Sequence, residues 1–334
     1  MAKRALITGV SGQDGAYLSR LLTEKGYEVF GLDINISEQA CWRLRYLDIY
    51  DKVNLIEADM EDGQALLAAV RRSAPGEIYN LAAHSAPGTS FQRPVECGDV
   101  TGLGLARLLE AARQSSPQAR IFQASTRDLF GPGDGGAYNE ERPFSPSNPY
   151  AAAKLYAHWM ARIYRDSYDM YICNGIMFNH ESPLRGLEFV TRKITDTAAG
   201  ISLGQEGRLK LGNMEAKIDW GYAPEYMQAA WLMLQQDDPD DYVIATGETH
   251  SVEEFVRRAF EILGLDWASY VEVDKGLMRP SDIVEQKGDY SKAEARLGWR
   301  PRVKFGRLVE IMVEEDLARW KRRANGEQLP WDVR

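Results

Sequence analysis

Cysteine, histidine and long apolar runs are scarce in this 334-residue sequence. The three cysteines, Cys41, Cys97 and Cys173, are too few and too widely spaced for a disulfide framework. The four histidines come without any CxxC or HxxxH spacing, so we predict no metal site. No apolar run approaches the roughly 20 residues that a membrane-spanning helix needs, and the N-terminus enters a strand-like run without the apolar region of a signal peptide. We therefore expect a cytoplasmic protein with no membrane partner.

Positive charge is also in deficit. The chain has 40 Lys and Arg residues against 49 Asp and Glu residues, a formal net charge of −9. A surface of that sign argues against nucleic acid as a partner, although a few local cations suffice to bind one phosphorylated small molecule. Hydrophobic residues make up 44% and charged residues 27% of the chain, which is typical of a folded globular protein.

The first half of the chain alternates short apolar runs with helix-like segments. Strands are predicted at 5–8, 27–32, 53–58, 77–82 and 119–124, and helices at 16–25 and 103–113. The apolar runs are continuous, which is typical of parallel strands that are buried on both faces. This repetition predicts an α/β fold built on a doubly wound parallel sheet.

From about Phe178 the rhythm becomes irregular. A strand at 243–245 and an amphipathic helix at 252–263 stand among loop-rich stretches, and no low-complexity linker separates the two halves. We predict a first domain over 1–177 and a smaller α/β C-terminal substrate lobe over 178–334. Some segments of about 211–250 are expected to return to the first domain.

Glycines at a regular spacing follow the first predicted strand. Gly9, Gly12 and Gly15 stand in Gly-x-x-Gly-x-x-Gly order, with Gln13 and Asp14 inside the motif, where the strand gives way to a helix. Such a turn lets a pyrophosphate approach the backbone, and N–H groups at the helix N-terminus meet its charge. A plain strand–helix turn is the alternative, but the position after the N-terminal strand favours a Rossmann-like dinucleotide site.

The end of the second strand predicts which dinucleotide binds. Asp33 lies there, and a carboxylate at this point accepts hydrogen bonds from ribose hydroxyls and repels a 2′-phosphate. No Lys or Arg occurs between Asp33 and Trp42, so we predict NAD rather than NADP; an ordinary loop acid is the alternative for Asp33. Further cofactor contacts are expected after the third and fourth strands, from Asp59, Met60, Leu81, Ala82 and Ala83.

A tyrosine and a lysine four residues apart carry the predicted chemistry. Tyr150 and Lys154 follow a proline at a helix start, and residues four apart on a helix share a face. The ammonium would favour a phenolate that removes a hydroxyl proton near neutral pH, while Thr126 hydrogen-bonds the same substrate oxygen. Asp128 could then take a proton α to the new ketone; a turn acid paired with Arg127 is the alternative.

At these residues the chain resembles the GDP-mannose 4,6-dehydratases, which are extended short-chain dehydrogenase/reductases. The resemblance runs nearly end to end, and its most distinctive part is Asn-His-Glu-Ser-Pro at 179–183 followed by Phe-Val-Thr-Arg-Lys at 189–193. Other specific stretches are 9–18, 126–131, 145–159, 211–221, 243–251 and 279–282. The resemblance implies a lyase of nucleotide-sugar metabolism that acts on a GDP-sugar.

The resemblance also implies binding residues. His180 and Arg185 would contact the nicotinamide half of the cofactor, which Tyr150 and Lys154 would touch as well. The sugar would lie beside His84 and Ser85. The remaining substrate contacts would come from Asn179, Val190, Lys193, Gly212, Asn213, Arg279 and Asp282. His84 itself could be an extra acid/base, or a packed or cofactor-bonded histidine.

The implied reaction is an internal redox cycle on the sugar. The C4 hydroxyl is oxidised with Tyr150 as the base, a carboxylate takes the C5 proton, the C6 hydroxyl leaves, and hydride returns to C6. The product is a GDP-4-keto-6-deoxy sugar, and no cofactor is consumed.

Departures from the family pattern leave other readings open. The family usually has Thr-Ser-Glu where this chain has Thr126-Arg127-Asp128, glutamine where it has His84, and arginines near Asn35 and Ile36 and at Ile218. A shorter acid beside a cation is a weaker and more distant base, so a GDP-sugar epimerase or C4 oxidoreductase is one alternative. A nucleotide-binding scaffold without activity is another. Because helices with the YxxxK motif often pair in this superfamily, we expect a homodimer, with a tetramer as the alternative.

Overall fold

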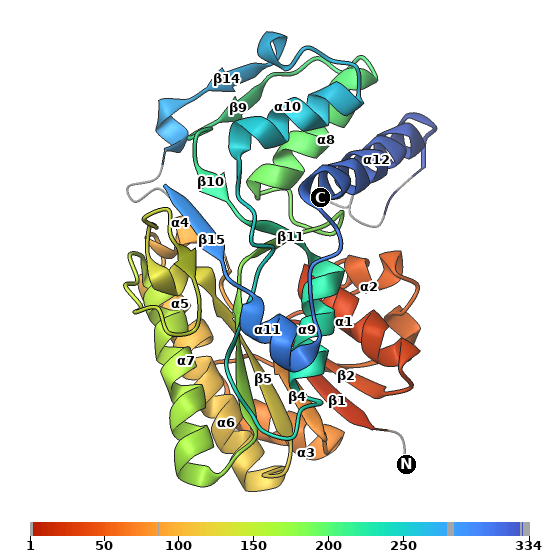
Figure 1. Ribbon diagram of the computed structural model, residues 1–334. Helices are drawn as coiled ribbons and strands as arrows, with labels where there is room; N and C mark the ends of the chain where they lie inside the picture. Colours follow the sequence, from red (N-terminus) through yellow and green to blue (C-terminus); the bar gives the residue numbers. More distant parts are fainter. Residues whose placement is uncertain (1–2, 86, 279–283, 328, 330–334) are drawn as a thin grey trace.

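A seven-stranded parallel sheet forms the centre of the computed structural model, which describes residues 3–85, 87–278, 284–327 and 329 (Figure 1). The strand order is β12-β7-β5-β4-β1-β2-β3. The strands are β1 (Arg4–Thr8), β2 (Glu28–Asp33), β3 (Val53–Glu57), β4 (Glu77–Asn80), β5 (Arg120–Thr126), β7 (Ile172–Met177) and β12 (Tyr242–Ile244). All neighbours pair in parallel, and the order runs outward from β1 in both directions, which confirms the predicted doubly wound sheet.

Helices cover both faces of this sheet. On one face α1 (Gln13–Glu24) packs against α9 (Ala223–Met233); the other face carries α3 (Gly63–Ser73), α6 (Gly104–Ser115) and α7 (Pro149–Tyr168) (Figure 1). Successive residues of β1 enter different cores, because Ala5 and Ile7 pack on the α1 side whereas Leu6 packs on the α3 side. Burial on both faces explains why the strands read as continuous apolar runs.

Several predicted boundaries are wrong by a few residues. The helix predicted at 16–25 begins at Gln13. Its first turn shows no apolar pattern in the sequence, because that turn is polar and faces a cavity instead of the core. The strand predicted at 77–82 ends at Asn80, after which the chain turns. The helix predicted at 103–113 is α6, and a π-helical segment, η2 (Gly98–Leu103), precedes it.

A second lobe lies beyond the carboxyl ends of the sheet strands (Figure 1). Its core is shared by α8 (Val190–Ser202), α10 (Val252–Ile262) and α12 (Phe305–Ala324). Its strands form small sheets: β13 (His250–Ser251), β10 (Lys217–Ile218), β15 (Glu285–Gly288) and β6 (Ala137–Tyr138) in that order, β14 (Val271–Val273) beside β9 (Leu209–Leu211), and β11 (Trp220–Tyr222) beside β8 (Asn179–Glu181). The short remaining helices include α2 (Trp42–Tyr46), α4 (Pro87–Ser90), α5 (Pro94–Cys97) and α11 (Ser291–Leu297).

Each half of the chain contributes to the other's sheets. β12 and α9, from the second half, belong to the central sheet and its α1 face, whereas β6, from the first half, pairs with β15. The two lobes are therefore joined by several crossings. A domain boundary at residue 178 stays a prediction.

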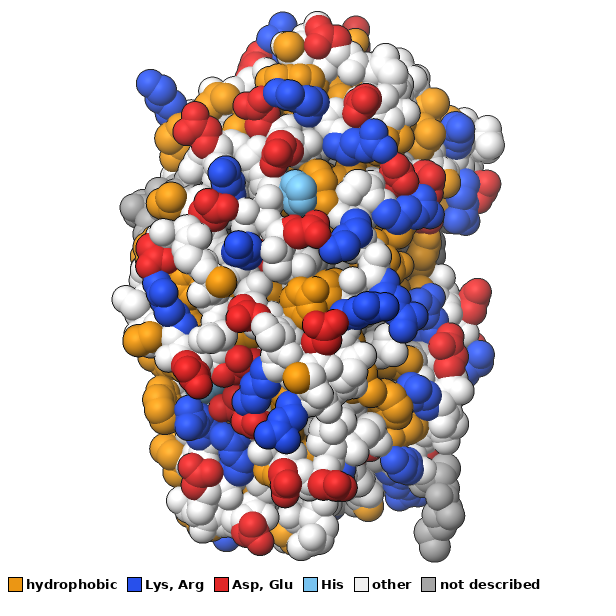
Figure 2. Space-filling view, viewed as in Figure 1, with side chains coloured by type: hydrophobic (Ala, Val, Ile, Leu, Met, Phe, Trp, Pro, Cys, Tyr) orange, Lys and Arg blue, Asp and Glu red, His pale blue; other side chains and the backbone are white. Residues whose placement is uncertain are grey.

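Charges of both signs are mixed over the surface. Figure 2 shows Lys and Arg side chains interspersed with Asp and Glu side chains on the face in view. Within the part of the chain that the structure describes, no helix is long and apolar enough to cross a membrane.

Candidate active site

Two adjoining cavities lie at the carboxyl ends of the central strands. The first encloses about 870 Å³ and the second about 1000 Å³, and they share the lining residues Asp14, Leu81, Ala83, Ser85 and Arg185. The two cavities therefore adjoin each other. Among the described residues, no group of three or more His, Cys, Asp or Glu side chains is placed to hold a metal ion.

The second cavity gathers most of the predicted cofactor residues. Its lining includes Gly9, Gly12, Gln13, Asp14, Gly15, Asp33, Asp59, Met60, Leu81, Ala82, Ala83 and Arg185. These residues come from four separate turns that follow β1, β2, β3 and β4, and from the segment after β8. The other predicted cofactor residues, Tyr150, Lys154 and His180, line the adjoining first cavity.

Glycines let backbone segments of the motif approach too closely for a side chain to fit. Gly9 has a φ of +71°, and a Cβ there would lie 2.9 Å from the backbone nitrogen of Ala82. A Cβ on Gly15 would lie 2.4 Å from the carbonyl oxygen of Gly9. Gly12 is the N-cap of α1 and supplies no side-chain cap to the helix N–H groups. This arrangement fits a pyrophosphate at the N-terminus of α1.

Asp33 is oriented by the glycine motif. The backbone N–H and the hydroxyl of Ser11 donate to Asp33 Oδ2 at 3.0 and 2.7 Å, and the N–H of Ile34 donates to Oδ1 at 2.9 Å. The carboxylate is therefore held at the end of β2 beside the cavity, where a ribose would meet it. Sequence reasoning did not single out Ser11, although it stands inside the glycine motif.

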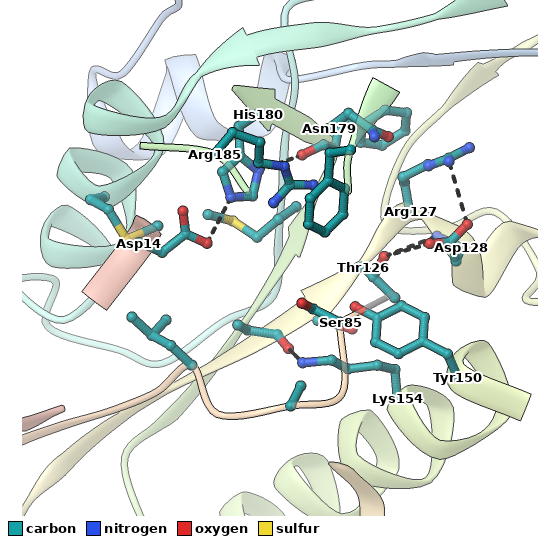
Figure 3. Close-up of a pocket in the computed structure, with 18 residues that line it drawn as sticks. Asp14, Ser85, Thr126, Arg127, Asp128, Tyr150, Lys154, Asn179, His180 and Arg185 are labelled. Atoms are coloured by element: carbon teal, nitrogen blue, oxygen red, sulfur yellow. Dashed lines mark hydrogen bonds and ion pairs between the residues drawn. The ribbon is translucent and has the colours of Figure 1, made fainter. Parts of the chain in front are cut away.

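The four predicted catalytic residues meet in the first cavity (Figure 3). α7 places Tyr150 and Lys154 on one face, and its N-cap Asn148 accepts a hydrogen bond from the N–H of Ala151 at 2.8 Å. Thr126 ends β5, and its hydroxyl donates to Asp128 Oδ2 at 3.3 Å. The hydroxyl, carboxylate, phenol and amine thus surround one space.

Burial shifts the pKa values of Tyr150 and Lys154 in opposite directions. Burial raises the pKa of Tyr150 above its ordinary value, the Asp128 charge adds to the rise, and a hydrogen bond with Thr126 opposes it. Burial also lowers the pKa of Lys154 to about 8. The Lys154 Nζ atom donates to the carbonyl of Ala124 at 2.7 Å and lies 5.9 Å from the centre of the Tyr150 ring. That Lys154 favours the phenolate stays a prediction.

Asp128 combines the two interpretations that the sequence left open. It lines the cavity, yet its Oδ1 atom lies 3.5 Å from an Nη atom of Arg127. Arg127 is buried and donates to Gln286 Oε1 at 2.5 Å, and the Gln286 amide donates in turn to the carbonyl of Gly131. Gln286 belongs to β15, so the second lobe holds the cation beside the acid. No local sequence signal marked Gln286.

His180 forms an ion pair with Asp14. Its Nε2 atom lies 2.8 Å from Asp14 Oδ2, and its Nδ1 atom lies 2.7 Å from the carbonyl oxygen of Phe178 (Figure 3). Burial alone would lower the pKa of His180, but the Asp14 carboxylate outweighs burial and raises this pKa. Burial would raise the pKa of Asp14, and His180 reverses that effect. The pair ties the glycine motif to the segment after β7.

The residues predicted to hold the substrate are dispersed. Asn179 and Ser85 line the first cavity, and His84 lines the second, where its Nε2 atom lies 3.4 Å from Glu96 Oε1. Val190 and Lys193 line neither cavity, and the Lys193 amine donates to the carbonyl of Lys210 at 2.6 Å. Gly212 and Asn213 line a third cavity that shares no residue with the other two. Arg279 and Asp282 lie outside the described residues.

The chain is similar to known proteins over nearly its whole length. A family model described as GDP-mannose 4,6 dehydratase matches residues 6–312. The GDP-mannose 4,6 dehydratase 1 of Arabidopsis thaliana is 45% identical, with 96% of this chain and 91% of the relative covered. The GDP-mannose 4,6 dehydratase of Homo sapiens is 42% identical, with 94% and 91% covered.

Solved structures share the fold. A dTDP-glucose 4,6-dehydratase from Streptomyces venezuelae with NAD and TYD bound superimposes with a TM-score of 0.83 at 24% identity, covering 98% of this chain and 100% of that one. A UDP-glucose 4-epimerase from Thermus thermophilus in complex with NAD has a TM-score of 0.81 at 25% identity, covering 94% and 98%. The Rossmann-like architecture is thus that of nucleotide-sugar enzymes with two different reaction outcomes.

Proposed function

The chain belongs to the GDP-mannose 4,6-dehydratase family, and from that premise we propose that it removes water from GDP-mannose or a close GDP-sugar. The observation that carries the proposal is the meeting of Thr126, Asp128 and Tyr150 in a cavity that adjoins the one lined by the glycine motif and Asp33. Oxidation at C4 and deprotonation at C5 need a proton acceptor for each step, and the site provides a phenol and a carboxylate.

The side chains divide the work between sugar carbons. As the phenolate, Tyr150 would take the proton of the C4 hydroxyl, and the Thr126 hydroxyl would hydrogen-bond the same oxygen. Bound in the second cavity, a nicotinamide dinucleotide supplies reversible hydride exchange and a positive charge that lowers the pKa of a nearby phenol. Asp128 would then take the C5 proton, which the ketone at C4 has made acidic, and pass it to the C6 hydroxyl, which leaves as water. Return of the hydride to C6 and of the proton held by Tyr150 to C5 completes the reaction. The Lys154 ammonium adds its positive charge to the site while it donates a hydrogen bond to the Ala124 carbonyl.

The reaction is tested by incubating the purified protein with GDP-mannose and following the sugar by NMR and mass spectrometry. Loss of one water with a new C6 methyl signal is expected. A product of unchanged mass, or a 4-ketone formed with equimolar reduced cofactor, would contradict the proposal and favour the second candidate below.

C4 oxidation or epimerisation without loss of water is that second candidate. It is favoured by one observation: Arg127 lies 3.5 Å from the Asp128 carboxylate, which in addition is one methylene shorter than the family's glutamate. The shorter side chain withdraws the carboxylate that elimination needs, and a misplacement of about 1 Å can cost on the order of a hundredfold in rate.

The cofactor in this proposal is NAD. Asp33 is fastened by two hydrogen bonds from Ser11 and places a negative charge where a 2′-phosphate would lie. We expect NAD to bind at least about tenfold more tightly than NADP, and Asp33→Asn to narrow that ratio by weakening NAD and relieving the repulsion of NADP. Isothermal titration with both dinucleotides measures the ratio. Equal affinity of the unchanged protein for NAD and NADP would refute the assignment.

The assembly in this proposal is a homodimer through α7. Tyr156, Trp159 and Ile163 form one stripe of that helix and are 43%, 46% and 47% exposed, and Leu103 of the adjoining η2 is 44% exposed. Large apolar side chains grouped in this way are typical of an interface.

Replacing the stripe with charge tests the dimer. Trp159→Glu combined with Ile163→Glu is expected to give a monomer in analytical ultracentrifugation, because two carboxylates per chain would have to be buried. Leu203→Glu, at an exposed apolar position beyond α8, is the matched control and should leave the mass unchanged. An unaltered sedimentation coefficient in the double variant would exclude this interface.

A further inference from the structure

Three successive backbone carbonyls in the segment 183–185 accept hydrogen bonds from arginines of three different helices. Arg43 of α2 donates its Nε–H to the carbonyl of Leu184 at 2.7 Å. Arg192 of α8 donates to the carbonyls of residues 183 and 185, both at 2.7 Å, and Arg319 of α12 donates to that of residue 183 at 2.7 Å. The segment is thus held from three sides.

Segment 183–185 carries the side chain of Arg185 into the site. Arg185 lines both cavities, at their junction, and its guanidinium lies 3.5 Å above the ring of Phe189 and 3.2 Å from Glu181 Oε2. The position of this cation depends on the backbone that carries it. Arg192 is in turn clamped by the buried carboxylate of Asp316, at 2.8 and 3.0 Å.

Arg43 differs from the other two arginines by reaching the glycine motif as well. A second N–H of its guanidinium donates to the carbonyl of Ser11 at 3.1 Å, and Ser11 is the residue that holds Asp33. A single planar group therefore connects the carboxylate at one end of the second cavity with Arg185 at the other. Arg43 lines neither cavity.

The groups around Arg43 lower the pKa of its guanidinium but leave it protonated, so it can donate to these carbonyls. Burial lowers its pKa to about 10, Glu188 opposes the change, and the neighbouring charges of Arg192, Arg185 and Arg319 lower it further. It stays protonated at neutral pH. Two of its nitrogen atoms, Nε and one Nη, donate to these carbonyls, although Arg43 follows Asp33 closely in the sequence.

We propose that Arg43 is a positioning residue that aligns the Ser11–Asp33 end and the Arg185 end of the dinucleotide cavity by bridging the carbonyls of Ser11 and Leu184. The inference rests on the proposed function, since it requires a dinucleotide in that cavity. Lysine cannot replace this group, because an ammonium is a point charge without the planar fork that spans two acceptors.

Two substitutions separate positioning from simple stability. In Arg43→Met and Arg43→Lys we expect the dissociation constant for NAD to rise about tenfold, because charged hydrogen bonds to two carbonyls are lost or reduced to one. Arg43→Lys should keep a melting temperature near that of the unchanged protein while still binding NAD weakly, so it carries the test even if Arg43→Met does not fold. Arg45→Met is the matched control on the same helix, where Arg45 pairs with Glu38 at 2.5 Å on the surface, and it should bind NAD normally.

Hydrogen exchange supplies a readout that does not need the cofactor. The amides of residues 184 and 185 should exchange at least about tenfold faster in Arg43→Lys than in the unchanged protein or in Arg45→Met. Normal NAD affinity together with normal exchange in Arg43→Lys would overturn the inference. Should the unchanged protein bind neither NAD nor NADP, the proposed function fails, and the exchange rates alone then decide whether Arg43 holds the segment.

Discussion

Replacing Tyr150 with phenylalanine is expected to lower kcat for GDP-mannose by about 10³-fold, the scale of a lost general acid–base group. The change removes one hydroxyl and keeps the ring, which packs with Cys97 and Ala153 beside the cavity. The variant should therefore fold and bind NAD as before. Product formation measured by mass spectrometry, together with NAD titration, separates the chemical defect from a binding defect.

The matched control for that variant lies on the same helix. Tyr168→Phe removes a phenol from an exposed position at the end of α7 that lines neither cavity, and it should leave kcat unchanged. Turnover by Tyr150→Phe at more than a tenth of the unchanged rate would show that another group takes the C4 proton. Lys154, whose pKa burial lowers to about 8, is the basic side chain on the same face of the helix.

Replacing Asp128 with asparagine should stop the loss of water while leaving C4 oxidation possible. The amide keeps the size of the side chain and its contact with Thr126, but it cannot accept the C5 proton. We expect dehydration to fall by about 10³-fold. Reduced dinucleotide and 4-keto sugar should accumulate instead, and the absorbance of the reduced nicotinamide reports them directly.

A second variant tests the length of the Asp128 side chain, whose carboxylate lies beside Arg127. Asp128→Glu moves the carboxylate by one methylene, toward the geometry usual in the family, and should keep dehydration within about tenfold of the unchanged rate. Asp128→Asn with undiminished dehydration would remove Asp128 from the mechanism. The same result would leave Tyr150, Lys154 and His84 as the candidate bases among the residues that the sequence singled out.

Much of the site was predictable because it is built from turns at strand ends. The glycine motif, Asp33 and the turn at 81–83 follow strands that are adjacent in a doubly wound sheet, so their meeting in one cavity follows from strand order. Tyr150 and Lys154 share a face because helical periodicity places residues four apart together. These predictions needed only local pattern and a general topology.

Other parts of the site depend on contacts between distant segments. Arg127 meets Gln286 only because β15 packs beside β6, and 159 positions separate the two residues. Arg43 lies just beyond the Asp33 loop in the sequence, and nothing near it indicates that it reaches Leu184, 141 positions away. No sequence period or spacing rule predicts contacts between residues so far apart in the chain.

The doubly wound sheet, the dinucleotide turn and the shared helix face of Tyr150 and Lys154 could be predicted from residue pattern alone, because each follows from the regular geometry of strands and helices. The charge and orientation of those groups depend instead on how the whole chain packs. Burial raises the pKa of Tyr150, and the Lys154 ammonium donates a hydrogen bond to the Ala124 carbonyl. Arg127 lies beside Asp128 and donates a hydrogen bond to Gln286 of the second lobe. Desolvation and long-range hydrogen bonds arise from the whole packed molecule, and no short stretch of residues contains them.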